Sequence, residues 1–157
     1  MCNHLPVAQA VLALRREWHK KRGETMNQQR VSETKENQLE KFILIVEDDI
    51  NNADIIELAL TSLTPYQVQS VSNAETALQL ISERKPDLLL LDEQLPGMTG
   101  LELYDYLHTI PEFSTVPALL LSASPYSIGE VEGHHLTFLS KPYELETLLE
   151  VIHRLLD

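Results

Sequence analysis

The strongest constraint on the fold is a run of four leucines at residues 88–91, with an acid on either side, Asp87 and Asp92. An unbroken apolar run of this length is typical of a strand buried on both faces, as at the centre of a parallel sheet. Pro96 and Gly97 follow closely and predict a loop. The sequence therefore predicts that Asp92 stands at the carboxyl end of a central strand, where open α/β sheets bind ligands. On this stretch alone, the alternative is that Asp92 only caps the loop.

Strand and helix signals alternate strictly from residue 42 to residue 157. Strands are predicted over residues 42–46, 66–71, 88–91, 116–121 and 136–139, and helices over residues 50–63, 73–85, 101–107 and 144–155. This alternation predicts a flavodoxin-like, doubly wound sheet of five parallel strands in the order 2-1-3-4-5, with helices on both faces. The first, third and fourth strands are the most apolar and are expected in the interior.

Composition and charge favour one acidic domain behind a basic extension. Residues 1–41 contain eight Lys and Arg against five Asp and Glu, whereas residues 42–157 contain four against nineteen. Such an acidic body repels phosphate backbones, so direct nucleic-acid binding by residues 42–157 is not expected. Cys2 is the single cysteine, no apolar run reaches the ~20 residues of a membrane span, and a cytoplasmic location is the expectation.

The N-terminal extension, residues 1–41, leaves three alternatives open. Residues 5–22 have apolar residues at helical spacing among basic ones, which favours a basic amphipathic helix that touches a partner or a membrane surface. The same segment could be a marginal helix, because isolated helices of this length are barely stable. Translation could also start at Met26. Residues 23–40 are polar and predict a flexible lead-in.

Acidic, hydroxyl and amino side chains gather where the predicted strands end. Asp48 and Asp49 follow the first strand, Asp92 ends the third, Ser122 the fourth, and Lys141 follows the fifth. Three carboxylates at one edge repel one another unless neutralised, and Mg2+ suits a site of a few carboxylates that also meets phosphate. Lys141 adds a positive charge and Ser122 a hydroxyl donor for a phosphoryl oxygen. A carboxylate nucleophile beside a metal and a lysine predicts an aspartyl phosphate.

This set of residues resembles the receiver domain of two-component response regulators, over about residues 42–156. The matching segments are VEDD at 46–49, LDEQLPGMTG at 91–100, LSA at 121–123 and FLSKP at 138–142. Each segment is weak alone, but four in order at the ends of the expected strands are highly specific. The resemblance implies a Mg2+-dependent phosphoprotein of a phosphorelay. Such a protein is not an enzyme but assists its own phosphorylation and dephosphorylation.

The resemblance also implies roles for individual residues. Asp92 would accept the phosphoryl group. Asp49 and Asp92 would hold Mg2+ with the backbone carbonyl of Gln94, and Asp48 would bind it through water. Lys141 would neutralise the phosphoryl group, and the Lys141–Pro142 bond matches one that is cis in the family.

Switching is implied for two further positions. Ser122 would hydrogen-bond the phosphoryl group, and Phe138 matches an aromatic residue that swings inward as the hydroxyl moves toward phosphate. Gln94 and Ser124 match positions that tune the phosphoryl lifetime. Between Ser122 and Lys141 the chain is a few residues short for the family and rich in Gly and Pro, so the helix expected there is short or unwound, and output through that face would be unusual.

The implied partners are a sensor histidine kinase or a histidine phosphotransfer protein, and a downstream target protein. The chain is expected as a monomer or a phosphorylation-dependent dimer. Two rivals remain: an unphosphorylated pseudo-receiver that acts as a scaffold, against which the complete site set argues, and a phosphatase-like enzyme, which commonly has an acid where this chain has Gln94. His134 and His135 lack an evident third metal ligand, and His108 and His153 are expected to be solvated.

Overall fold

The computed structural model describes Lys20, residues 41–123, residues 129–130 and residues 135–157. The predictions for the N-terminal extension and for Ser124 and His134 lie outside the described residues. The elements in chain order are β1 (Phe42–Val46), α3 (Ile50–Leu63), β2 (Gln67–Val71), α4 (Ala74–Glu83), β3 (Leu88–Asp92), α5 (Gly100–His108), β4 (Ala118–Ser122), β5 (Gly129–Glu130), β6 (Leu136–Ser140) and α6 (Leu145–Leu156). Among the described helices, none combines the length and the apolar character needed to cross a bilayer.

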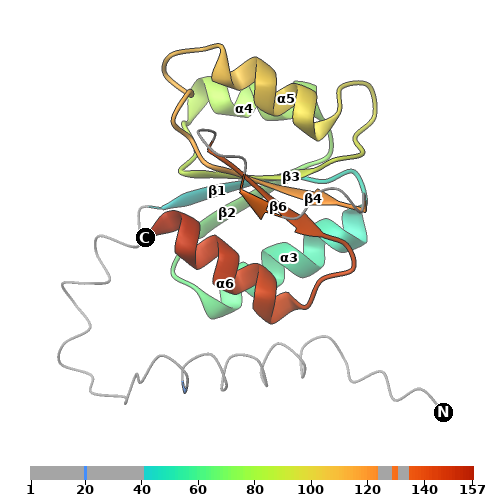
Figure 1. The fold of residues 1–157 in the computed structure, drawn as a ribbon, viewed down its shortest axis with the longest axis vertical. Coiled ribbons are helices and arrows are strands. Elements are labelled where there is room, and N and C mark those ends of the chain that lie inside the picture. The colour runs from blue at the N-terminus through green and yellow to red at the C-terminus, as the bar shows by residue number, and fades with distance from the viewer. Residues whose placement is uncertain (1–19, 21–40, 124–128, 131–134) are drawn as a thin grey trace.

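The sheet has the order β2-β1-β3-β4-β6-β5. Its five long strands are all parallel, which confirms the predicted order 2-1-3-4-5. The two-residue strand β5 was not predicted and pairs antiparallel with β6 at the edge. The prediction that the helix between Ser122 and Lys141 is short or unwound concerns residues 124–128 and 131–134, which lie outside the described residues. Helices α4 and α5 cover one face of the sheet, and α3 and α6 cover the other (Figure 1).

The three central strands position the site because they are buried along their whole length. Every residue of β1, β3 and β4 is buried, as expected for strands covered by helices on both faces. Successive residues of β1 point to opposite faces, so Ile43 and Ile45 pack with α3 and α6, and Leu44 and Val46 pack with α4 and α5. Each fully buried aliphatic side chain contributes roughly 1.5–3 kcal/mol, so the carboxyl ends of these strands form a rigid base.

Two histidines correct a prediction, since neither His108 nor His153 is simply solvated. Both ring nitrogens of His108 lie close to main-chain carbonyl oxygens, at 2.9 Å from Tyr104 and 3.1 Å from Val116. His153 contacts the Tyr66 hydroxyl at 3.1 Å and the Asp157 carboxylate at 3.0 Å. Both histidines lie in the last turn of a helix, where they bond to their own helix end and to a segment before a strand. Helical periodicity does not reveal such contacts.

Candidate functional site

A cleft opens where the carboxyl ends of β1, β3, β4 and β6 meet. Its volume is about 490 Å³, which is enough for a phosphoryl group together with a hydrated cation. Asp92, the last residue of β3, lines this cleft and is only 7 % exposed. The expectation that Asp92 ends a central strand at the ligand-binding edge of the sheet is therefore met.

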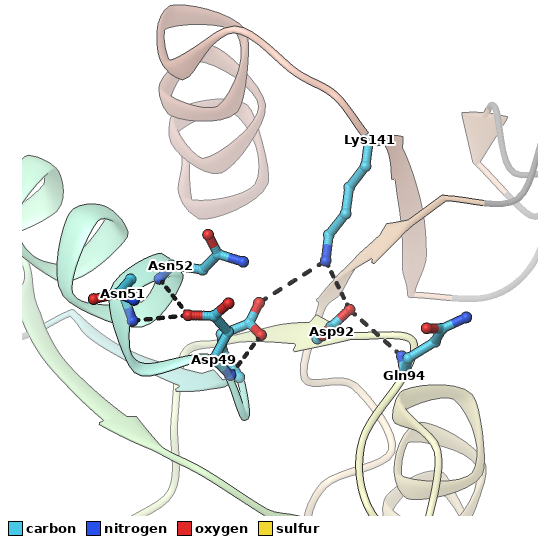
Figure 2. Close-up of polar contacts among 7 residues, drawn as sticks. Asp49, Asn51, Asn52, Asp92, Gln94 and Lys141 are labelled. Atoms are coloured by element: carbon cyan, nitrogen blue, oxygen red, sulfur yellow. Dashed lines mark hydrogen bonds and ion pairs between the residues drawn. The ribbon is translucent and has the colours of Figure 1, made fainter. Parts of the chain in front are cut away.

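Lys141 forms an ion pair with the Asp92 carboxylate, and both residues line the cleft. The Lys141 Nζ atom lies 2.9 Å from Asp92 Oδ1 and 3.9 Å from Glu47 Oε2. Figure 2 shows the Lys141 side chain extended from the end of β6 toward Asp92. The Lys141 main-chain N–H donates to the Ser122 carbonyl at 2.7 Å, and the Lys141–Pro142 bond is cis, as the family resemblance implied. The Gln94 N–H approaches the same Asp92 oxygen at 3.4 Å.

Three of the carboxylates that line the cleft lie close together. Glu47, Asp48 and Asp92 each place one oxygen within a group whose atoms all lie within 4.8 Å of one another. The pKa of Glu47 is raised to about 7, chiefly by burial and also by the nearby Asp92 charge, whereas a main-chain hydrogen bond from Asp49 lowers it. Hard oxygen donors this close, with a surplus of negative charge, fit a divalent cation such as Mg2+.

The structure does not bring Asp49 into this group. Its side chain caps α3 instead, where Oδ1 accepts the N–H groups of Asn51 at 2.9 Å and Asn52 at 3.3 Å (Figure 2). Glu47, to which the sequence-based prediction gave no role, is buried and belongs to the group in place of Asp49. A signal for this arrangement exists in the sequence: α3 begins at Ile50, and Asp is among the residues preferred immediately before a helix.

Ser122 and Phe138 belong to β4 and β6, two of the strands that end at the cleft. Ser122 ends β4 and is completely buried, and its hydroxyl donates a hydrogen bond to the Glu93 carboxylate. Phe138 is half-buried in the middle of β6, opposite Leu120 of β4. Glu93 lines the cleft whereas Ser122 does not, and no sequence pattern pointed to Glu93.

The Glu47→Gln variant is expected to remove a pH-dependent loss of stability in the metal-free protein. The pKa of Glu47 is about 7 in the folded state against 4.5 ordinarily. The protonated Glu47 therefore contributes its full stabilisation of the fold below pH 4.5. This contribution to the free energy of unfolding is lost as the pH rises to 7, and the loss is roughly 3 kcal/mol at most. Glutamine keeps an oxygen for the Asp49 N–H and carries no charge.

Urea unfolding in EDTA between pH 4.5 and pH 8 measures this difference. The exposed Glu83→Gln variant serves as the control. We expect Glu47→Gln to gain stability over the wild type as the pH rises and Glu83→Gln to follow the wild type. Parallel profiles for all three proteins would contradict the prediction.

Comparison with known proteins agrees with this geometry. The family model for the response regulator receiver domain matches residues 43–153. The response regulator DivK of Brucella anthropi is 30 % identical over 115 residues, which cover 71 % of this chain and 93 % of DivK. The transcriptional regulatory protein PhoB of Pseudomonas aeruginosa is 31 % identical over 112 residues, which cover 69 % of this chain and 48 % of PhoB. For most of the first curated relatives, as for PhoB, the match spans about half of their length.

A solved structure is similar in the fold and informative about the cleft. The receiver domain of the sensor histidine kinase PA1611 from Pseudomonas aeruginosa superimposes with a TM-score of 0.63 at 25 % identity, covering 74 % of this chain and 97 % of that domain. That structure contains a magnesium ion coordinated in its active-site cleft. In this chain, the group of Glu47, Asp48 and Asp92 lies in a cleft at the carboxyl edge of the sheet.

Proposed function

This chain belongs to the response regulator receiver domain family, and from that premise we propose that it is a phosphoacceptor switch of a two-component phosphorelay. Receiver domains are signalling phosphoacceptors that bind Mg2+ at their acidic site. The observation that carries the proposal is the placement of Asp92: its carboxylate lies at the end of the central strand, nearly buried, 2.9 Å from Lys141. A carboxylate held this way is pre-positioned as a nucleophile.

We assign the chemistry as follows. An Asp92 oxygen forms a bond to the phosphorus of a phosphohistidine on a sensor histidine kinase or a histidine phosphotransfer protein, while the bond from phosphorus to the histidine nitrogen breaks. The Lys141 ammonium neutralises charge on the phosphoryl oxygens. Glu47, Asp48, Asp92 and the Gln94 carbonyl would hold Mg2+, which supplies further compensation of charge at the phosphoryl oxygens. This set replaces Asp49 with Glu47, because the Asp49 carboxylate caps α3.

Phosphorylation would then change a binding surface. The phosphoryl group adds roughly 1.5 to 2 negative charges beside Ser122. Movement of the Ser122 hydroxyl and of Phe138 would shift the equilibrium between two arrangements of the face formed by β4, β6 and α6, and a downstream protein would bind one of them. The match to the response regulator DivK supports such a signalling role.

Intact mass spectrometry after incubation with acetyl phosphate and Mg2+ tests the proposal. We expect a labile gain of one phosphoryl group that is absent in Asp92→Asn and in EDTA. Because a receiver can ignore small donors, a negative result is followed by incubation with a phosphorylated histidine kinase. No gain from either donor would reject the proposal in favour of an unphosphorylated scaffold.

A further inference from the structure

The residue after the phosphoacceptor, Glu93, has a side chain that the assigned chemistry does not use. Its backbone is fixed on both sides: the Glu93 N–H donates to the Leu121 carbonyl at 2.9 Å, and its carbonyl accepts the Gly100 N–H at 3.1 Å. From this fixed point the carboxylate reaches across to β4 and accepts the hydroxyl hydrogen of Ser122. Glu93 therefore accepts the hydrogen of the Ser122 hydroxyl, which is the hydroxyl group that the proposed function places next to the phosphoryl group.

We propose that Glu93 is a positioning residue that withholds the Ser122 hydroxyl from the phosphoryl site until Asp92 is phosphorylated. This inference rests on the proposed function and names a regulator of the same site. A serine hydroxyl has one hydrogen, so it donates either to Glu93 or to a phosphoryl oxygen, not fully to both. Glu93 and the phosphoryl group are thus competing acceptors for one donor.

Burial makes this competition strong. Ser122 is completely buried at the end of β4, whereas Glu93 is partly exposed and lines the cleft. A hydrogen bond from a buried hydroxyl to a carboxylate is charge-assisted and about twice as strong as a neutral one. The unphosphorylated arrangement is stabilised by this contact, which raises the threshold for switching.

Phosphorylation of Asp92 would also weaken the hydrogen bond between Ser122 and Glu93. Glu93 is the chain neighbour of Asp92, so a phosphoryl group on Asp92 places two like charges at the same cleft and repels the Glu93 carboxylate. Within the described part of the chain, the three-carboxylate group consists of Glu47, Asp48 and Asp92 and does not include Glu93. Its charge can therefore leave the cleft without removing a cation ligand.

Beryllofluoride with Mg2+ serves as the test ligand, because it mimics a phosphoryl group on an aspartate, and fluorine NMR measures its affinity. We expect Glu93→Ala to bind it about tenfold more tightly than the wild type. Glu93→Gln keeps an acceptor without the charge and is expected to lie between them. Glu112→Ala removes one exposed carboxylate outside the cleft and is expected to match the wild type. A merely structural role for Glu93 would lower the affinity.

Double variants separate the hydroxyl competition from simple charge repulsion. In a Ser122→Ala background there is no hydroxyl to release, so the gain from Glu93→Ala is expected to fall to about twofold or less. In metal-free protein, Glu93→Ala and Ser122→Ala are expected to shift the urea midpoint by less together than the sum of their separate shifts. Additive effects in either cycle would overturn the inference.

The outcomes also distinguish this inference from the proposed function. A wild-type protein that binds beryllofluoride while Glu93→Ala binds it no better would overturn the role of Glu93 and leave the phosphoacceptor function standing. A wild-type protein that takes up neither beryllofluoride nor a phosphoryl group would overturn both.

Discussion

Replacing Lys141 with methionine is expected to slow phosphorylation of Asp92 by about a hundredfold to a thousandfold. The same change is expected to tighten Mg2+ binding. Lys141 Nζ lies 2.9 Å from Asp92 Oδ1, so under the proposed function this ammonium would compensate charge on the incoming phosphoryl oxygens. Methionine retains an apolar stem of similar length but no positive charge, so the donated phosphoryl group would lose that stabilisation.

The tighter Mg2+ binding follows from the same contacts. Before phosphorylation, Lys141 is the cation that offsets Asp92 and, at 3.9 Å, Glu47. Mg2+ competes for these oxygens and is also repelled by the ammonium across the cleft. Removing the ammonium leaves the carboxylates more negative, so the affinity for Mg2+ rises while the rate of the chemical step falls.

The matched control is Lys41→Met. Lys41 forms an ion pair of 3.5 Å with Asp87, near the start of β1 and away from the cleft, and both side chains are more than a third exposed. The Lys41→Met substitution changes the net charge of the protein by the same amount as Lys141→Met. Calorimetric titration of Mg2+ and the rate of mass gain from acetyl phosphate are the two measurements. Loss of both Mg2+ affinity and rate in Lys141→Met would show that Lys141 only maintains the fold of the cleft.

The limits of sequence reasoning for this chain can be traced to particular residues. Strands β1, β3 and β4 are buried on both faces, so their apolar runs determine their positions and their central place in the sheet. Asp92 and Lys141 could then be placed at the carboxyl edge. Local pattern carries this information because a parallel strand covered on both sides has no polar residue to interrupt it.

The sequence pattern could not predict the direction in which side chains point after a strand ends. Glu47, Asp48 and Asp49 are three consecutive acids, and the turn into α3 determines that the first faces Lys141 while the last caps the helix. The hydrogen bond from Ser122 to Glu93 joins residues 29 positions apart, one at the end of β4 and the other directly after β3, and neither residue type reveals it. Both features depend on how separate strand ends meet in space.

The Gly100→Ala variant is expected to destabilise the protein by about 2–3 kcal/mol and to disturb the phosphoacceptor directly. A Cβ atom at Gly100 would lie 2.2 Å from the main-chain oxygen of Asp92 and 2.9 Å from Leu120 Cδ1. The Asp92 oxygen belongs to a central strand between β1 and β4 and cannot move freely. The start of α5, fixed by the capping box of Thr99 and Glu102, must therefore shift away from β3.

Gly97→Ala is the matched control for this prediction. Gly97 lies in the same loop with φ of +79°, and an added Cβ would meet nothing within 4 Å. Its substitution is expected to cost only the conformational strain, about 1–2 kcal/mol. Urea unfolding gives the stabilities, and the rate of mass gain from acetyl phosphate reports on Asp92. We expect Gly100→Ala to lose both stability and phosphorylation rate and Gly97→Ala to lose chiefly stability, because, of the two added Cβ atoms, only the one at Gly100 would clash with the backbone of Asp92. Equal losses of rate in the two variants would refute this assignment.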